Sequence, residues 1–123
     1  MIVNGLEQQQ IAIADRALQY GDGCFTTMAF RNGCFELFNP HIKRLKLACK
    51  TLHIDFDKWA ELEHCIVESI KPFVDCVIKV IITRGEGGRG YSPDVAVNPN
   101  YIITHHTITQ SYTCPFYTSD AAQ

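Results

Sequence analysis

The chain of 123 residues has a net charge of −2, 46% hydrophobic residues and 20% charged residues, the composition of an ordinary globular protein of one domain. Its basic residues are scattered rather than grouped, which argues against nucleic acids or acidic membrane surfaces as partners. No apolar run is long enough to span a bilayer, and the first residues lack the basic and apolar pattern of a signal peptide.

The six cysteines are far apart in the sequence and form no C-x-x-C pair. Zinc sites and redox motifs need such close pairs, because two ligands must converge from one turn. We therefore expect no metal site, and reduced thiols in a cytoplasmic protein. The cysteines are Cys24, Cys34, Cys49, Cys65, Cys76 and Cys114.

Turn signals divide the first third of the chain. Asn4-Gly5 and Asn32-Gly33 each predict a tight hairpin, because both central residues of a type I′ turn need positive φ. Between them, Asp15 predicts the N-cap of a short helix that Gly21 ends.

The second hairpin joins two predicted strands, residues 24–31 and 34–38. The pairs predicted by this turn are Arg31 with Cys34, Phe30 with Phe35, Met28 with Leu37, and Thr27 with Phe38. One face of the hairpin is then core, and the other is a mixed face that we expect to line a cleft. The core face carries Met28, Phe30, Phe35 and Leu37, and the mixed face carries Phe25, Thr27, Ala29 and Glu36.

Two amphipathic helices follow. Asn39 as N-cap and Pro40 at the first helical position predict a helix over residues 41–52. A second helix is predicted over residues 57–71, with Pro72 ending it. The expected buried positions are Ile42, Leu45, Cys49 and Leu52 in the first helix, and Trp59, Leu62, Ile66 and Ile70 in the second.

Residues 74–83 are β-branched and almost wholly apolar, which predicts a central strand, and residues 101–109 predict another. This order of elements predicts an α+β fold, a small, mostly antiparallel sheet with two main helices packed on one face. We expect residues 1–109 to form one domain. The Ser, Thr, Pro and Asp of residues 110–123 are typical of the start of a linker.

The loop after the first of these strands reads R-G-E-G-G-R-G-Y and satisfies G-x-G-x-x-G. A dinucleotide site would need a helix directly after this loop, but Ser92-Pro93-Asp94 and extended sequence follow. Two interpretations remain open. The loop is a flexible hairpin connection, or its glycines admit a ligand whose carboxylate meets Arg84 or Arg89.

Arg44 is a second candidate for anion binding. Lys43, Lys46 and Lys50 share the outer face of the first long helix, whereas Arg44 points to another flank, near His41. An arginine beside small neighbours can hold an anion through bidentate contact. From position alone, an ordinary surface arginine remains the simpler interpretation.

Three stretches together resemble the fold-type IV pyridoxal-phosphate enzymes. They are DRALQYGDGCFTT at residues 15–27, HIKRL at residues 41–45 and VIITRGEGGRGY at residues 80–91. This group includes branched-chain and D-amino-acid aminotransferases and aminodeoxychorismate lyase. The first and third stretches are more similar to the lyase branch than to the aminotransferases.

The resemblance implies a two-domain, homodimeric enzyme that uses pyridoxal 5′-phosphate. In the lyase branch such an enzyme releases pyruvate from 4-amino-4-deoxychorismate and leaves 4-aminobenzoate, a folate precursor. It also implies that Arg44 binds the cofactor phosphate and that Phe25 and Thr27 line the substrate pocket. Arg89 and Tyr91 become candidate substrate contacts.

The resemblance places the cofactor-bearing lysine, and the acidic partner of the cofactor ring nitrogen, in a C-terminal domain beyond Gln123. No lysine of this chain matches that lysine, and we expect Lys79 to be an edge or sheet-face residue. We therefore expect no catalytic residue here and an inactive fragment. Two alternatives stay open: a fragment of a related aminotransferase, and a non-catalytic domain for anion binding or dimerisation. The six lysines are Lys43, Lys46, Lys50, Lys58, Lys71 and Lys79.

Overall fold

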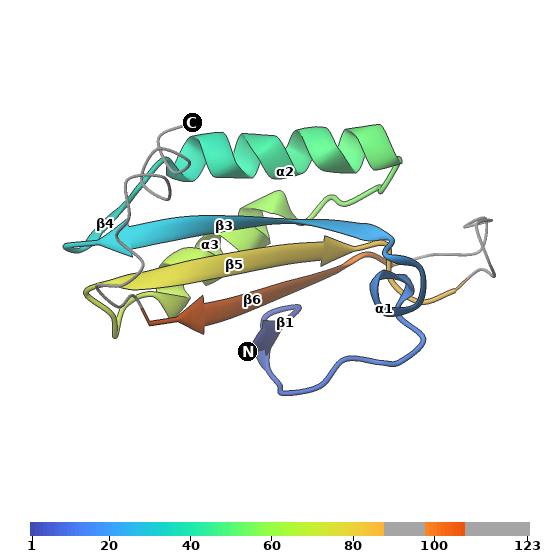
Figure 1. Cartoon of the computed structure of the whole chain (residues 1–123), viewed down its shortest axis with the longest axis horizontal. Coiled ribbons are helices and arrows are strands. Elements are labelled where there is room, and N and C mark those ends of the chain that lie inside the picture. The colour runs from blue at the N-terminus through green and yellow to red at the C-terminus, as the bar shows by residue number, and fades with distance from the viewer. Residues whose placement is uncertain (88–97, 108–123) are drawn as a thin grey trace.

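The computed structural model of the chain describes residues 1–87 and 98–107. In these residues, antiparallel strands form one six-stranded sheet in the order β2-β1-β6-β5-β3-β4. The two longer helices, α2 and α3, pack on the same face of the sheet, with α2 beside β3 (Figure 1). The predicted α+β architecture is therefore confirmed.

The elements in chain order are β1 (Ile2–Val3), β2 (Leu6–Glu7), α1 (Arg16–Tyr20), β3 (Gly23–Arg31), β4 (Cys34–Phe35), α2 (Phe38–Leu52), α3 (Trp59–Ser69), β5 (Cys76–Thr83) and β6 (Asn100–His106).

Both predicted hairpins are present. β1 and β2 pair across Asn4-Gly5, and β3 and β4 pair across Asn32-Gly33, with positive φ at all four turn residues. Asp15 is the N-cap of α1, and Gly21 ends this helix with φ of 64°. The turn chemistry of the first third of the chain was therefore predicted correctly.

The second hairpin is shorter than predicted. Phe30 pairs with Phe35 as expected, but Leu37 and Phe38 do not continue the strand as partners of Met28 and Thr27. Leu37 has φ of 56° and precedes α2, whose first residue is Phe38. The rings of Phe35 and Phe38 pack edge to face, 4.8 Å apart. The helix therefore starts directly after the strand, because the left-handed turn at Leu37 redirects the chain.

The start of α2 also differs from the prediction. Leu37, rather than Asn39, occupies the N-cap position and makes no side-chain cap. Pro40 is the third residue of the helix instead of the first. Proline is tolerated there, because the amides of the first turn have no partner within the helix.

The buried stripe of α2 is confirmed at Ile42, Leu45 and Cys49, but Leu52 is 39% exposed. Leu52 is the last residue of the helix, and the chain turns away at His53, which has φ of 57°. Ile54 takes the expected inward position and is 5% exposed. The helical periodicity fails at Leu52 because the helix ends there.

The helix α3 and the strand β5 are each shorter than predicted, whereas β6 begins one residue earlier than predicted, at Asn100. Leu62, Ile66 and Ile70 are buried as expected, and Trp59 is partly buried. β5 lies between β3 and β6, which confirms the predicted central strand. Residues 108 and 109 of the last predicted strand lie outside the described residues.

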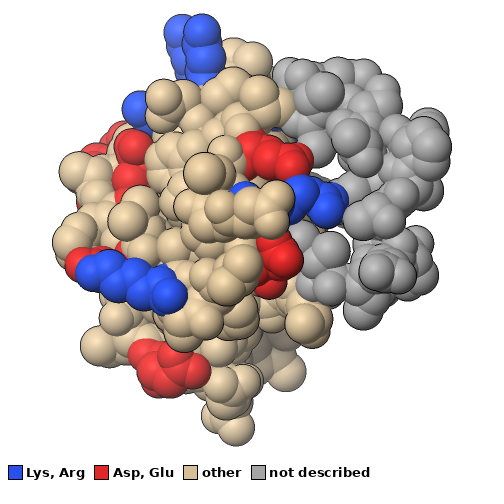
Figure 2. Space-filling model, turned by 90° about the vertical axis from the view of Figure 1, so that its left-hand side faces the viewer, with Lys and Arg blue, Asp and Glu red and all other residues tan. Residues whose placement is uncertain are grey.

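Charged side chains of both signs are visible on one side of the molecule (Figure 2). On the side shown in Figure 2, basic and acidic side chains alternate with uncharged surface over the described residues. No helix among the described residues is long and apolar enough to cross a membrane.

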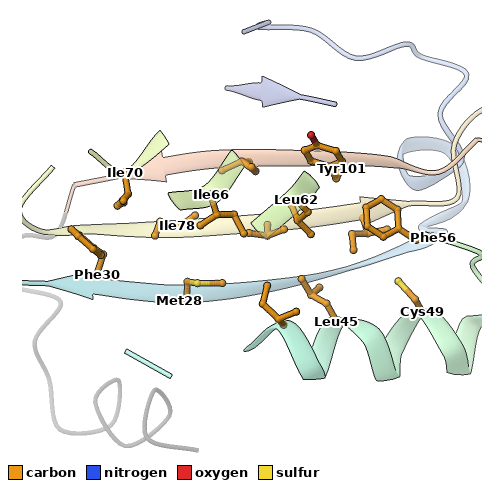
Figure 3. Close-up of a cluster of buried hydrophobic side chains, with 14 of the residues drawn as sticks. Met28, Phe30, Leu45, Cys49, Phe56, Leu62, Ile66, Ile70, Ile78 and Tyr101 are labelled. Atoms are coloured by element: carbon orange, nitrogen blue, oxygen red, sulfur yellow. The ribbon is translucent and has the colours of Figure 1, made fainter. Parts of the chain in front are cut away.

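The core fills the space between the two long helices and one face of the sheet (Figure 3). Every second residue of β5 points into it, and Cys76, Ile78, Val80 and Ile82 are all fully buried. Met28 and Leu62 meet this row from β3 and α3, at 1% and 0% exposure. The intervening residues of β3 and β5 face away from the helices, and this helix-free side of the sheet is called the open face below.

Candidate functional site on the open face of the sheet

Phe25 and Thr27 lie on the open face, as the alternation of β3 predicts. The ring of Phe25 is 60% exposed, and the side chain of Thr27 is exposed as well. Ala29, placed on the same mixed face by the sequence, is only 2% exposed. The exposed part of the open face is therefore the half that carries Phe25 and Thr27.

Lys79 of β5 belongs to this group, although sequence reasoning gave it no function. It pairs with Thr27 across the two strands, so both side chains lie on the open face. The Lys79 Nζ atom lies 4.6 Å from the centre of the Phe25 ring. The expected sheet-face position is confirmed. Lys79 lies between buried Ile78 and Val80 in the strand. This alternation could have shown that its side chain points to the face opposite the core.

A shallow hollow of about 260 Å³ lies between α1 and the side chains of Phe25 and Lys79. It is open to solvent and mostly apolar, and Lys79 is its one charged lining residue in the part of the chain that the structure describes. Its lining residues are Ala17, Gly21, Gly23, Cys24, Phe25, Lys79 and Ile81. The surface can accept a flat apolar group beside a positive charge.

One end of the open face is closed by a buried polar network around Asp15. The Asp15 side chain is fully buried, and its Oδ1 atom accepts the Ala17 amide at 2.8 Å. Its Oδ2 atom accepts from the Thr83 hydroxyl and the Asn100 amide, both at 2.8 Å. The carboxylate thus caps α1 and fixes this helix against the ends of β5 and β6.

A second carboxylate, Asp22, joins α1 to the end of β5. Its Oδ2 atom accepts from Arg16 Nε at 2.8 Å and from Arg84 Nε at 2.7 Å. Burial by itself would raise the pKa of Asp22, but the hydrogen bonds and charges of Arg84 and Arg16 outweigh burial and hold the pKa below its usual value. The carboxylate is therefore ionised at neutral pH.

Arg84 is fully engaged within the domain. Its Nη1 and Nη2 atoms donate to the carbonyl oxygens of His53 and Leu52, at 2.9 and 2.6 Å. A guanidinium at these carbonyls also complements the negative end of α2. Of the two arginines that the loop offers for a ligand carboxylate, Arg84 is therefore a structural residue that already binds Asp22.

The base of the glycine-rich loop is tied to α1. The Arg16 amide donates to Gly85 O at 2.9 Å, and the Arg16 guanidinium donates to Gly87 O at 3.3 Å. A Cβ atom at Gly85 would lie 2.0 Å from the Asn98 carbonyl oxygen, so only glycine fits there. The candidate substrate residues Arg89 and Tyr91 follow this base and lie outside the described residues.

Arg44 projects from α2 into solvent. No carboxylate among residues 1–87 and 98–107 forms an ion pair with it. One turn earlier, buried His41 shares a 2.7 Å hydrogen bond between its Nδ1 atom and Thr26 Oγ1. Burial and, second, the charge of Arg44 lower the pKa of His41. A neutral His41 therefore leaves the guanidinium as the local charge available to an anion.

The sequence profile described as amino-transferase class IV matches residues 23–113. The chain belongs to the class IV aminotransferase family. Membership of this family confirms the resemblance seen in the sequence, and it explains why the strand, helix and glycine-rich loop occur together.

The chain is similar in sequence to two curated relatives and in fold to two solved structures. An aminodeoxychorismate lyase from Vibrio harveyi is 36% identical over 110 residues, which are 89% of this chain and 41% of the relative. A putative branched-chain-amino-acid aminotransferase from Methanocaldococcus jannaschii is 31% identical over 90 residues, 68% of this chain and 30% of the relative.

The crystal structure of 4-amino-4-deoxychorismate lyase from Pseudomonas aeruginosa matches with a TM-score of 0.77 at 37% identity, over 85% of this chain and 38% of that chain. The branched-chain amino acid aminotransferase of Escherichia coli has the same TM-score at 19% identity, over 86% of this chain and 38% of that chain, which shows a shared fold alone. The chain spans about two-fifths of the length of the lyases it matches.

Proposed function

We propose that the chain is the phosphate- and substrate-binding part of a pyridoxal-phosphate-dependent 4-amino-4-deoxychorismate lyase. Such an enzyme releases pyruvate and forms 4-aminobenzoate for folate synthesis. The observation that carries this proposal is the identity of 36% and 37% to two lyases over more than four-fifths of the chain. The Escherichia coli aminotransferase has the same fold at 19% identity, so fold alone does not distinguish the two activities.

Arg44 fits the phosphate group of the cofactor. Arg44 is exposed on α2. The neighbouring His41 is neutral at neutral pH, because its pKa is lowered, so it does not repel the guanidinium. Arginine binds phosphate oxygens through two parallel N–H donors, which fixes orientation as well as charge. When bound, pyridoxal phosphate supplies a ring that withdraws electrons from the bond that breaks in the substrate.

Phe25 and Thr27 are proposed as walls of the substrate pocket, because they are the exposed side chains of β3 on the open face. Arg89 and Tyr91 are proposed as substrate contacts from the glycine-rich loop. The contacts of Arg16 with Gly85 and Gly87 support this role, because they hold the base of that loop at the edge of the open face. The chain's own part in the reaction is thus to bind and orient.

The lysine that carries the cofactor is proposed to lie outside these residues. Lys43, Lys46 and Lys50 are on α2, Lys79 is on β5, and Lys58 and Lys71 flank α3, and we propose that none of the six is the family's cofactor lysine. We propose that residues 1–109 are the small domain, that residues 110–123 begin a linker, and that a C-terminal domain supplies the lysine. A cytoplasmic homodimer is part of the same proposal.

A related aminotransferase is the second candidate function, favoured by the 31% identity to the Methanocaldococcus jannaschii relative. The test is a chimera that joins this chain to the C-terminal part of the Vibrio harveyi lyase, assayed for 4-aminobenzoate formation and for amino-group transfer. We expect 4-aminobenzoate. Amino transfer from branched-chain amino acids without 4-aminobenzoate would instead establish the aminotransferase.

The chain alone tests the placement of the lysine. Borohydride reduction after titration with pyridoxal phosphate should give only scattered labelling below one equivalent, and one stoichiometrically labelled lysine would contradict the proposal. In the chimera, Arg44→Ala should weaken cofactor binding on the order of tenfold or more, because a charged bidentate contact is lost. Lys43→Ala, an exposed cation on the same helix, is the matched control.

A further inference from the structure

Lys79 is a cation on the open face of the sheet. Among residues 1–87 and 98–107, no carboxylate forms an ion pair with its ammonium group. Its recorded contact is the face of the Phe25 ring, 4.6 Å from Nζ to the ring centre. Lys79 is half-buried on a central strand, and its ammonium group donates no hydrogen bond to the residues that the structure describes, so its donors are available to a ligand.

The neighbours of Lys79 suit a flat ligand. Phe25 presents an aromatic surface that is 60% exposed, and the apolar Ile81 is its cross-strand partner. Thr27 is the cross-strand partner of Lys79, so its side chain lies on the same face of the sheet as the lysine. A flat ring can pack on Phe25 while its substituent reaches Nζ, because the hollow between them is open to solvent.

We propose that Phe25, Thr27 and Lys79 form a binding site for a six-membered ring that bears a carboxylate. Lys79 Nζ donates to the carboxylate, Phe25 packs against the ring, and the Thr27 hydroxyl donates a second hydrogen bond. The site deepens the proposed lyase function and rests on it for the identity of the natural ligand. Both products of that reaction, pyruvate and 4-aminobenzoate, carry a carboxylate. In this proposal Lys79 binds the carboxylate that is attached to the ring.

The fold contains a matched control for this lysine. Lys46 of α2 also lies over an aromatic ring, with its Nζ atom 5.6 Å from the centre of the Trp59 ring. Lys46 extends from an exposed helix position on the helix-covered side, whereas Lys79 lines the hollow on the open face. A comparison of the two separates a binding site from the general effect of removing one lysine.

The test titrates the 123-residue chain with benzoate and follows binding by ¹H–¹⁵N NMR. We expect saturable shifts at the amides of Phe25, Thr27 and Lys79. Lys79→Met should weaken benzoate binding roughly tenfold, because a charge-assisted hydrogen bond is lost. Lys46→Met should leave the affinity unchanged, and neutral benzamide should bind the wild-type chain as weakly as benzoate binds Lys79→Met. Lys79→Arg keeps the charge and should retain most of the affinity.

Equal benzoate affinity of the wild-type chain and Lys79→Met would overturn the proposal, as would shifts confined to the surroundings of Arg44. Absence of benzoate binding would overturn it too. Dispersed spectra of both methionine variants establish that each is folded before the affinities are compared. If benzoate binds at Lys79 but the chimera forms no 4-aminobenzoate, the lyase function is rejected and the binding site is kept. If the chimera forms 4-aminobenzoate but benzoate does not bind at Lys79, only the binding site is rejected.

Discussion

The two faces of the sheet are built from alternate residues of the same strands, yet they differ in almost every physical property. On the helix-covered face, Met28 and Ile78 are at most 1% exposed and belong to one continuous apolar core. On the open face, Phe25 is 60% exposed and shares its surface with the cation of Lys79. The first face explains why the chain folds, and the second is where ligand chemistry is available.

The comparison predicts that the helix-covered face carries most of the stability. Phe30→Ala removes a ring that is 7% exposed and packs on Phe35 at 4.9 Å. We expect the free energy of unfolding to fall by about 3–5 kcal/mol, from lost transfer energy and the cavity left behind. Urea denaturation followed by circular dichroism measures it. A fall below about 1 kcal/mol would show that this face is not a tightly packed core.

The buried network at the end of the open face should have the next largest effect. Asp15→Ala removes the N-cap of α1 and leaves the Thr83 hydroxyl and the Asn100 amide without their acceptor. We expect a loss of about 2–3 kcal/mol in the same denaturation experiment. Asp55→Ala, at an exposed carboxylate, serves as the control and should have little effect. An equal loss of stability in the two variants would contradict the structural role assigned to Asp15.

The sequence predicted the helix-covered face better than the open one. Alternation in β3 at Met28 and helical spacing at Leu45 and Leu62 identified core residues correctly, because burial against one continuous surface follows simple periodicity. The errors fall at element ends, such as Leu52, where tertiary contacts decide how far an element continues.

The open face could be predicted only in part, because ligand contacts do not follow a period. The mixed face of β3 was predicted from one strand, but Lys79 gains its neighbours only when β5 is placed next to β3. Arg84 shows the opposite case. The sequence offered it as a ligand-binding arginine, whereas the structure pairs it with Asp22, which is distant in sequence. Both outcomes depend on contacts between distant residues that no local pattern encodes.

The ion pairs of Asp22 predict a pH-dependent contribution of intermediate size. Asp22→Asn should lower stability by about 1–2 kcal/mol at pH 7, a value reduced because solvent reaches part of the site. The pKa of Asp22 is lower in the folded chain than in the unfolded chain, so this stability is present above about pH 4 and is lost as the pH falls further. The gap between wild type and variant, measured by thermal unfolding from pH 7 to pH 3, should therefore shrink towards low pH. A constant gap would contradict the charge interaction.

Phe25→Ala should have the smallest effect on stability, although it removes the same side chain as Phe30→Ala from the same strand. The ring of Phe25 is 60% exposed, so its removal leaves no closed cavity, and the contact with Lys79 contributes about 0.5–1 kcal/mol at such a site. We expect a loss below about 1 kcal/mol in urea denaturation. A loss as large as that of Phe30→Ala would mean that this part of the open face is packed in solution, and Phe25 would then be a core residue instead of a pocket wall. A small loss is the result expected of a pocket wall, because an exposed ring contributes little to the core.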